Sequence, residues 1–293
     1  MNPILKGLYA DPDIIKWQDT YYIYPTSDGF DGWGGYEFYV FASKDLENWE
    51  RKGKIIDFHR GDVNWAKECA WAPCILERKG KFYFYFCGKR EDGVSCIGAA
   101  VSQSPEGPFK AADKPMITPE MVKERGINIC QTIDPSVYAE GDRAYILFGN
   151  GTPVIAELSE DCMSLRVETM KEIKGVYDFR EAVTVLKKDG IYHYTWSCDD
   201  TGSENYHVNY GTADSLEGPV TYRYAILEKC PEKNILGTGH HSILKDNDTY
   251  YIAYHRFGTP LEKYPDGKGF HRETCIDRLK FGQDGLMEKV KVR

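Results

Sequence analysis

The sequence predicts an all-β fold, a five-bladed β-propeller with four antiparallel strands in each blade. Three observations support this prediction. A hairpin pattern of apolar stretch, polar turn and aromatic-rich stretch recurs five times along the 293 residues. Aromatic residues reach 14% of the composition, which suits packed sheets. The long runs with helical periodicity that a βαβ fold requires are missing.

The five hairpins follow one another at similar spacing. In each hairpin, β-branched and aromatic residues flank a turn that contains Gly, Asp or Asn, which is typical of paired antiparallel strands. The hairpins span residues 12–24, 73–84, 135–146, 182–194 and 241–252. A tyrosine in the second strand aligns them, at Tyr22, Tyr83, Tyr145, Tyr192 and Tyr251, with steps of 61, 62, 47 and 59 residues.

Most hairpins are followed by another strand and a second shared motif. This motif occupies residues 42–46, 101–108 and 212–219. A hairpin followed by a second hairpin makes a four-stranded unit, and five such units arranged radially leave only short sheet edges exposed. No linker or change of composition divides the chain, so we expect residues 1–293 to form one domain.

Charge and composition exclude several classes of protein. The 37 Lys and Arg against 45 Asp and Glu give a formal charge of −8 without a long basic run, which disfavours nucleic-acid binding. Apolar stretches such as residues 82–87 are far shorter than the roughly 18–20 residues of a membrane-spanning helix. Nine cysteines without a C-x-x-C pair, and no signal peptide, lead us to expect reduced thiols and a cytoplasmic protein.

Ionisable residues gather at one position of the repeat. Eleven residues before the aligned tyrosines stand Asp11, Ala72, Asp134, Glu181 and His240. We expect this position, at the start of each first strand, to face the central channel. An acidic residue before a strand is often a solvated turn residue. Three carboxylates around one axis, however, raise one another's pKa and cost stability, so the pattern favours catalysis or cation binding.

Two carboxyl groups facing a cleft, one ionised and one protonated, can hydrolyse a glycosidic bond. The acid protonates the leaving oxygen, and the other group activates a water or attacks the sugar directly, depending on the gap. A third carboxylate would keep the pKa of the acid high. Sugar rings stack on aromatic faces, so Trp71, Phe30 and Trp33 are candidate platforms, with core packing as the alternative.

Five motifs in the correct order resemble the blade motifs of glycoside hydrolase family 43. They are residues 9–13, Trp71-Ala72-Pro73, Ile133-Asp134-Pro135-Ser136, Arg180-Glu181-Ala182 and Gly237-Thr238-Gly239-His240. The resemblance implies an inverting mechanism in which Asp11 is the general base, Glu181 is the general acid, and Asp134 orients Glu181 and raises its pKa.

The same resemblance implies two further roles. His240 would lie on the propeller axis and help waters to hold a calcium ion, because a lone His offers too few ligands by itself. Arg272 would reach sugar hydroxyls in the terminal subsite, with a salt bridge inside the fifth blade as the alternative. Cys74 and Ala182 depart from the residues common in the family, which leaves the substrate less defined.

We therefore expect an exo-acting hydrolase that releases terminal α-L-arabinofuranose, β-D-xylose or both from hemicellulose-derived oligosaccharides. The C-terminal β-sandwich of many family xylosidases is not expected. An endo-arabinanase or another furanosidase of the family is an alternative. A retaining fructan-cleaving hydrolase is disfavoured because Ile133 stands where an Arg would precede the second Asp. The same residues also fit a non-catalytic glycan-binding propeller or a protein that only binds a metal on its axis.

Overall fold

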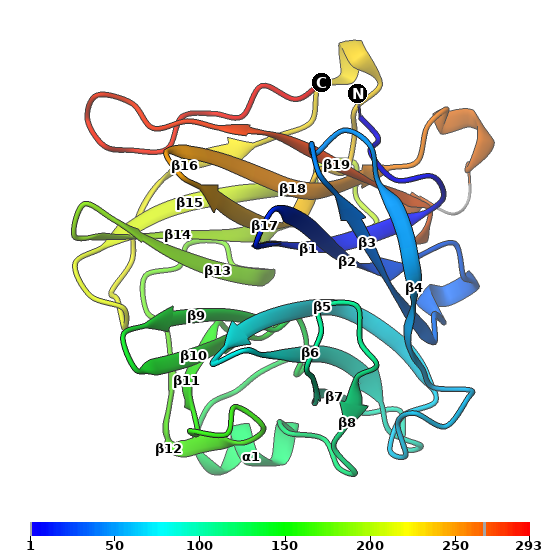
Figure 1. The fold of residues 1–293 in the computed structure, drawn as a ribbon. Coiled ribbons are helices and arrows are strands. Elements are labelled where there is room, and N and C mark those ends of the chain that lie inside the picture. The colour runs from blue at the N-terminus through cyan, green and yellow to red at the C-terminus, as the bar shows by residue number, and fades with distance from the viewer. Residues whose placement is uncertain (1, 266–267) are drawn as a thin grey trace.

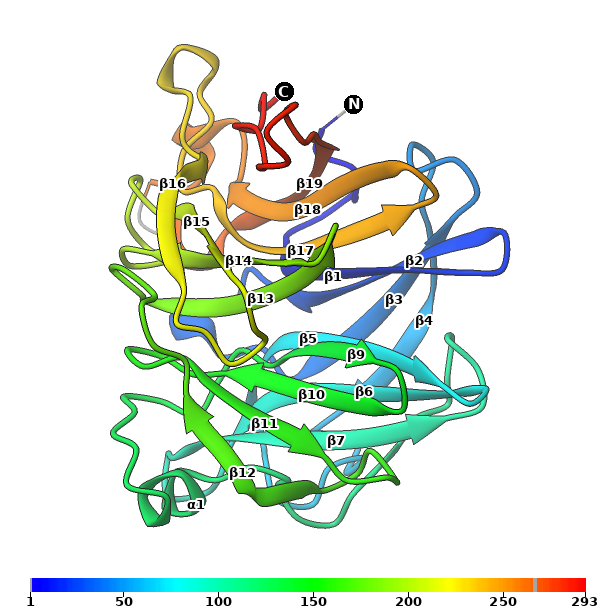
Figure 2. The same ribbon diagram turned by 90° about the vertical axis from the view of Figure 1, so that its left-hand side faces the viewer.

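The computed structural model describes residues 2–265 and 268–293. Within them, nineteen strands form five antiparallel sheets, and the first strand of every sheet contributes to one common channel (Figures 1 and 2). The prediction of a five-bladed β-propeller is thereby confirmed.

Consecutive strands pair within each blade. Blade one contains β1 (Tyr9–Trp17), β2 (Thr20–Ser27), β3 (Glu37–Ser43) and β4 (Glu50–Asp57); blade two contains β5 (Glu68–Arg78), β6 (Lys81–Lys89), β7 (Ser95–Ser102) and β8 (Lys110–Ala111); blade three contains β9 (Ser136–Glu140), β10 (Arg143–Phe148), β11 (Val154–Leu158) and β12 (Leu165–Glu172); blade four contains β13 (Glu181–Lys188), β14 (Ile191–Cys198), β15 (His207–Ala213) and β16 (Thr221–Leu227); blade five contains β17 (Gly239–Asp246), β18 (Thr249–Phe257) and β19 (Arg272–Leu279).

Helical segments are few and short. One α-helix, α1 (Pro119–Glu124), follows blade two, and four single-turn 3-10 helices lie in loops at Asp31–Trp33, Pro231–Lys233, Leu261–Lys263 and Lys268–Phe270. Among residues 2–265 and 268–293, no helix has the length and apolar character needed to cross a lipid bilayer.

Blade five differs from the expected four strands, because three strands of it are seen in the described chain. The N-terminal segment covers the outer edge of β19 instead. The Ile4 N–H group donates to the Thr274 carbonyl at 2.9 Å, and the Asn2 side-chain oxygen accepts from the Ile276 N–H group at 2.9 Å. The two ends of the chain therefore meet at the last blade (Figure 1).

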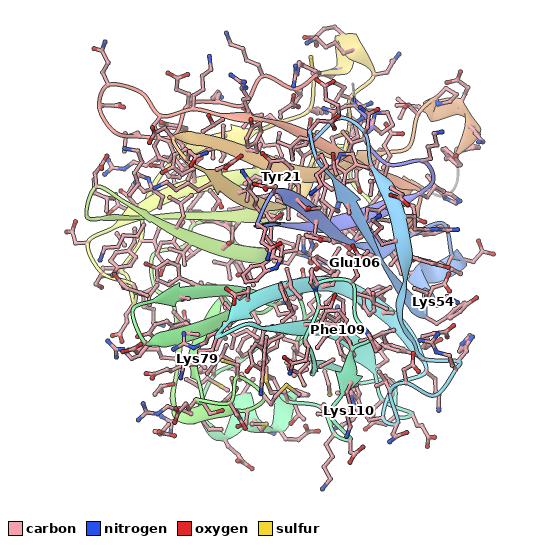
Figure 3. All side chains as sticks on the ribbon, viewed as in Figure 1. Tyr21, Lys54, Lys79, Glu106, Phe109 and Lys110 are labelled. Carbon is pink, nitrogen blue, oxygen red and sulfur yellow. The ribbon has the colours of Figure 1, made fainter. Side chains whose placement is uncertain are left out.

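The hydrophobic core lies between the blades. Five clusters of buried apolar side chains each contain residues of two neighbouring sheets, and together they cover all five junctions, including the one between blades five and one. Figure 3 shows these side chains filling the spaces between the sheets, whereas Lys79 and Lys110 lie on the outside. Both faces of most sheets are therefore apolar, which explains the long apolar runs in strands such as β6.

In or just before each first strand, the residue at one shared position of the repeat lies in the left-handed region of backbone conformation. In blades one, two, four and five this residue opens a bulge, in which two residues oppose one residue of the second strand. The five left-handed residues are Asp11 (φ 46°), Ala72 (φ 44°), Asp134 (φ 60°), Ala182 (φ 56°) and His240 (φ 38°).

The register corrects one step of the repeat alignment. Leu186 of β13 pairs with His193, as Ile15 pairs with Tyr22 in blade one. The residue equivalent to Tyr22 is therefore His193 and not Tyr192. Ala182 is consequently the blade-four equivalent of Asp11, and Glu181 lies one position earlier in its strand.

A repeated hydrogen bond, here called the inter-blade lock, fixes four of the left-handed residues. A side chain from the second strand of one blade accepts the backbone N–H group of the left-handed residue in the next blade. The donor and acceptor pairs are Ala72 N and Thr26 Oγ1 at 2.7 Å, Asp134 N and Cys87 Sγ at 3.2 Å, His240 N and Ser197 Oγ at 2.9 Å, and Asp11 N and His255 Nδ1 at 3.3 Å. The lock holds the inner strands in register around the channel.

Candidate active site

A cavity of about 200 Å³ adjoins the channel, with which it shares Asp11, Asp134 and His240. It is lined by Asp11, Trp33, Trp71, Gln131, Ile133, Asp134, Asn150, Arg180, Glu181, Asp200, Thr201, His240 and Arg272. The structure thus brings together the three predicted catalytic carboxylates, Trp71, His240 and Arg272. Phe30 lies outside this lining and packs against Tyr36, with ring centroids 5.4 Å apart.

Asp11 is buried among cationic and hydrogen-bonding partners. Its Oδ1 atom lies 3.0 Å from Arg272 Nη1 and 2.9 Å from His255 Nδ1, and its Oδ2 atom accepts from the Thr26 hydroxyl at 2.7 Å. Burial alone would raise the pKa of Asp11, but its polar surroundings, the Arg272 guanidinium above all, outweigh this and hold that pKa well below its usual range. Asp11 is therefore ionised.

Arg272 joins the first and last blades. Its Nε and Nη2 atoms donate to Asp28 at 3.0 and 3.1 Å, and its Nη1 atom also donates to Thr201 at 3.2 Å. The side chains of Arg272 and Asp28 are 4% and 3% exposed, so this ion pair is shielded from water. The partners of Arg272 thus lie in blade one and in the loop after β14, rather than within blade five.

Glu181 is held by two neutral donors. Asn150 Nδ2 donates to Oε2 at 2.7 Å, and the Tyr206 hydroxyl donates to Oε1 at 2.8 Å. Burial raises the pKa of Glu181, and the Tyr206 hydrogen bond and the Arg180 charge offset this only in part. The surroundings of Glu181 thus favour its protonated form more than water would.

Asp134 shares this acidic environment. Burial raises the pKa of Asp134 well above its usual value, and the neighbouring carboxylates of Glu181 and Asp11 raise it further. The pocket therefore contains one ionised carboxylate, Asp11, beside two carboxyl groups whose pKa values are raised. Environments that separate the pKa values of neighbouring acids in this way distinguish a base from an acid.

A stacked pair of rings links the two sides of the pocket. The rings of Tyr206 and His255 are parallel within 3°, with centroids 5.5 Å apart. Tyr206 binds Glu181, and His255 lies against Asp11. Displacement of either ring would therefore disturb both carboxyl groups.

Four residues that contact Asp11 or Glu181 were not anticipated from the sequence, namely Thr26, Asn150, Tyr206 and His255. Thr26 and His255 pair across their hairpins with the residue just before the left-handed position, so the strand register would have located them. Asn150 lies in an Asn-Gly-Thr sequence that reads as a turn, and Tyr206 lies in the loop before β15. Neither of these two shows a sequence signal.

Loops of blades one and five close one side of the cavity. Trp33 Nε1 donates to the Gly269 carbonyl at 2.8 Å, and Trp71 Nε1 donates to the Trp33 carbonyl at 2.7 Å. Glycine is required at position 269, because a Cβ atom there would lie 2.6 Å from the Trp33 ring. These hydrogen bonds close the cavity on the side of Trp33 and Trp71, so it is a pocket rather than an open cleft.

His240 is the candidate metal ligand. Its Nδ1 atom lies 3.3 Å from Asp11 Oδ1 and 3.6 Å from Asp134 Oδ2, and burial lowers the pKa of His240 to about 4. The imidazole is therefore neutral, the form that binds metals. Within the described residues, no group of three or more His, Cys, Asp or Glu side chains is placed to hold an ion. His240 thus fits a cation whose remaining ligands are waters.

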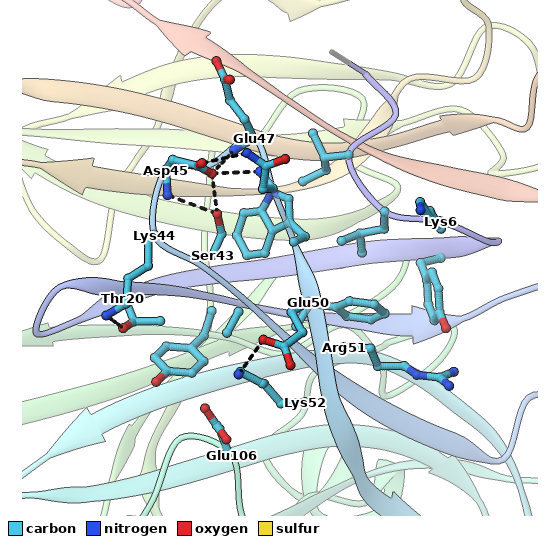
Figure 4. A pocket seen from close by; sticks show the side chains of 18 residues that line it. Lys6, Thr20, Ser43, Lys44, Asp45, Glu47, Glu50, Arg51, Lys52 and Glu106 are labelled. Carbon is cyan, nitrogen blue, oxygen red and sulfur yellow. Dashed lines mark hydrogen bonds and ion pairs between the residues drawn. The ribbon is translucent and has the colours of Figure 1, made fainter.

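A larger groove of about 1030 Å³ lies over blade one and shares no lining residue with the pocket of the carboxylates (Figure 4). Several of its charged side chains are paired locally. Lys52 lies 2.7 Å from Glu50, Lys44 donates to Thr20 at 2.6 Å, and Asp45 accepts from the backbone of its own turn. We therefore place the candidate active site in the smaller pocket.

Comparison with known proteins agrees with this geometry. The family model for glycosyl hydrolases family 43 matches residues 1–287. The chain is 29% identical to the β-D-galactofuranosidase xynD of Aspergillus niger, over 99% of the chain and 85% of the relative. It is 26% identical to a xylosidase/arabinosidase of Bacteroides ovatus, over 98% of the chain and 97% of the relative.

A solved structure shares the fold over nearly the full length of both chains. This is CoXyl43, a family 43 β-xylosidase/α-arabinofuranosidase from a compost microbial metagenome, solved with xylotriose in a calcium-free form. The TM-score is 0.81 at 26% identity, covering 99% of this chain and 96% of that chain. The protein is a glycoside hydrolase, and its chain belongs to glycosyl hydrolase family 43.

Proposed function

We propose that the protein is an inverting, exo-acting glycosidase that releases terminal α-L-arabinofuranose, β-D-xylose or both from hemicellulose-derived oligosaccharides. The main support is one pocket that combines an ionised Asp11 with a buried Glu181 whose pKa is raised. The pocket volume of about 200 Å³ is below the roughly 300–1,000 Å³ of typical small-molecule sites, which suits a single sugar ring.

In this mechanism Asp11 accepts a proton from a water molecule as that water attacks the anomeric carbon. The glycosidic C–O bond breaks on the opposite face, and the leaving oxygen takes the proton of Glu181. Asp11 ends protonated and Glu181 ends ionised, and exchange with solvent restores both groups. Asp134 and Glu181 resist double ionisation, so the pair favours keeping a proton available for the leaving oxygen.

The choice of sugar rests on relatives. The Bacteroides ovatus relative is a xylosidase/arabinosidase, and CoXyl43 was solved with xylotriose. The Aspergillus niger relative is a β-D-galactofuranosidase, which makes a galactofuranoside the second candidate substrate.

We also propose that His240 helps to hold a hydrated calcium ion, which would add positive charge beside the carboxylates. The neutral, buried imidazole supports this proposal. The CoXyl43 structure is a calcium-free form, which points to calcium binding in other members of the family. Metal analysis of the purified protein, and calorimetric titration of chelated wild type and His240→Ala with calcium, test it. Equal heats for the two proteins would contradict the proposal.

The function is tested with aryl α-arabinofuranosides, β-xylosides and β-galactofuranosides, with NMR detection of the first anomer released. Inversion gives the β-anomer from an α-arabinofuranoside, whereas the α-anomer would indicate retention and overturn the role of Asp11.

Asp11→Asn is expected to lower kcat by about 10²–10⁴-fold on all substrates. Glu181→Gln is expected to lose as much on poor leaving groups and far less on good ones. Absence of turnover on the whole panel would favour a glycan-binding propeller.

A further inference from the structure

The Arg180 side chain contains a donor that the described structure leaves unused. Its Nε–H group is buried without a hydrogen-bond partner, although the outer part of the side chain reaches solvent. Buried donors without a partner are rare in native proteins, because they lose hydrogen bonds to water and gain none in return. Such a group next to a reactive site calls for a functional explanation.

The rest of Arg180 is firmly held. The backbone N–H group donates to the Ser197 carbonyl at 3.0 Å, and the Arg180 carbonyl accepts from Gly151 at 2.8 Å. At the outer end of the side chain, Nη2 donates to Asp200 Oδ2 at 2.9 Å. The orphan Nε–H group is thus fixed in place rather than left over from a flexible side chain.

The nearest acid to this donor is Glu181. Arg180 Nε lies 3.8 Å from Glu181 Oε2, which is too far for a hydrogen bond but within reach of a small movement. Each oxygen of Glu181 already accepts one hydrogen bond, from Asn150 or from Tyr206. A carboxylic acid needs no further donor, whereas a carboxylate has about four lone-pair sites and so can accept two more hydrogen bonds.

We propose that Arg180 is a positioning residue for the general acid, and that its Nε–H group closes onto Oε2 as Glu181 becomes a carboxylate. The proton of Glu181 passes to the leaving oxygen while the glycosidic bond breaks, and Arg180 keeps its own protons throughout. Asp200 holds the guanidinium ready for this step. This inference rests on the proposed function, in which Glu181 is the acid.

The charged and titratable groups that face Glu181 come from four segments. They are Arg180 beside it, Tyr206 before β15, Asp134 before β9 and Asp11 in β1, with His240 also lining the pocket. Tyr206 and Arg180 lower the pKa of Glu181, whereas burial and Asp11 raise it, and Glu181 in turn raises the pKa of Asp134. Removing the Arg180 guanidinium therefore raises the pKa of Glu181, because the carboxylate form of Glu181 is less stabilised.

The experiment compares Arg180→Met, which has a similar reach without charge, with Arg180→Lys, which keeps the charge but lacks the Nε–H donor. Arg143→Met is the matched control, because Arg143 is an exposed arginine on the outer part of β10, near Glu157. For each variant, kcat and kcat/KM are measured across pH on aryl glycosides with good and poor leaving groups.

For Arg180→Met we expect the alkaline limb of kcat/KM to move up by about one pH unit. We also expect kcat to fall about tenfold or more on poor leaving groups, with little change on good ones. Arg180→Lys should lie between Arg180→Met and wild type, and Arg143→Met should match wild type.

Two results would overturn the inference. A raised KM with an unmoved alkaline limb would mean that Arg180 only binds the leaving sugar. A limb that moves down would mean that the substitution merely admits water, because hydration lowers the pKa of a buried acid. The Glu181→Gln variant separates these failures from failure of the proposed function. If its loss of activity is independent of the leaving group, Glu181 is not the acid.

Discussion

The Arg272 guanidinium lies 3.0 Å from the Asp11 carboxylate, and this contact separates Asp11 from the other acids of the pocket. Asp134 and Glu181 have the same functional group, but burial and mutual repulsion dominate their surroundings. At the residue scale, therefore, the partners of each carboxyl group determine whether it takes up or releases a proton. A change in one partner is expected to move one limb of the pH–rate profile.

The Asp134→Asn substitution tests this relation, because it replaces one carboxyl oxygen with an amide nitrogen and removes the titrating group. Because Asp134 and Glu181 repel each other when both are ionised, we expect that removing the carboxyl group of Asp134 makes Glu181 easier to ionise. The alkaline limb of kcat/KM should move to lower pH, and kcat should fall by about ten- to a hundredfold, less than for loss of the acid itself. An unmoved limb with unchanged kcat would mean that Asp134 only supports the backbone.

The sequence could indicate the three acids because they recur near one position of a repeat. It could not indicate Asn150 or Tyr206, whose side chains reach Glu181 from loops without periodicity. It also could not place Phe30, because its loop directs Trp33 rather than Phe30 into the cavity. Loop side chains depend on long-range packing, which a local pattern does not contain.

At the element scale, the bulge and the inter-blade lock act together. A left-handed backbone conformation is unfavourable for residues with a Cβ atom, and it persists where neighbouring structure enforces it. In four blades the lock supplies this support from the preceding sheet. In blade four, Ala182 occupies the left-handed position, and the acid Glu181 stands one residue earlier.

The one-residue error in the blade-four alignment follows from the same feature. The number of residues between the bulge and the second strand depends on the length of the turn that joins the two strands. Counting back from an aligned tyrosine therefore finds the equivalent residue only where that tyrosine occupies the same position in the strand pairing. Aromatic residues at positions 192 and 194 flank His193, and the pattern could not distinguish the pairing of Tyr192 from that of His193. Strand register required the structure.

Thr26→Val tests the lock. Thr26 is buried, and its hydroxyl donates to Asp11 and accepts from the Ala72 N–H group. Valine keeps the shape but leaves that N–H group unpaired, so the free energy of unfolding should fall by about 1–3 kcal/mol in urea titration. The turnover should fall as well, because Asp11 loses a donor.

Thr26→Ser is the control for this substitution, since serine retains the hydroxyl, and it should stay close to wild type in stability and rate. Equal behaviour of the valine and serine variants would show that the lock contributes nothing measurable.

At the scale of the whole molecule, the channel itself contains a titrating group. Asp13 of β1 lines the channel and accepts from the Ile75 N–H group of blade two at 2.7 Å. Burial raises the pKa of Asp13 to about 7, although hydrogen bonds from Ile75, Ile14 and Ser242 oppose the shift. In the unfolded chain an aspartate titrates near pH ~4.

The sign of the pH dependence follows from these two values. Between about pH 4 and 7 the folded protein binds a proton that the unfolded chain has released. The stabilisation is complete below about pH 4 and is lost as the pH rises through 7. Asp13→Asn keeps an oxygen acceptor for Ile75 and removes this titration.

Thermal unfolding should therefore give a higher Tm for Asp13→Asn than for wild type at pH ~8, and similar values at pH ~4. A chelator is included so that no cation neutralises the carboxylate. Asp19→Asn, in the exposed turn between β1 and β2, is the control and should follow wild type at both pH values. Parallel curves for Asp13→Asn and wild type would contradict the assignment.

The fold as a whole was predictable because hairpins, turns and aromatic strands repeat with regular spacing. The closure of the circle was not predictable, since Asn2 and Ile4 reach β19 across nearly the full length of the chain. The count of four strands per blade also failed to describe blade five, where the N-terminal segment covers the edge of β19.

The contacts between blades five and one have a consequence for synthesis in the cell. His255 and Arg272, which hold Asp11, follow it in the sequence by 244 and 261 residues. A nascent chain therefore leaves the ribosome with most of its blades complete while Asp11 still lacks the groups that orient and ionise it. Activity begins only after synthesis has passed Arg272, so turnover reports on completion of the fifth blade in a way that the formation of the earlier sheets does not.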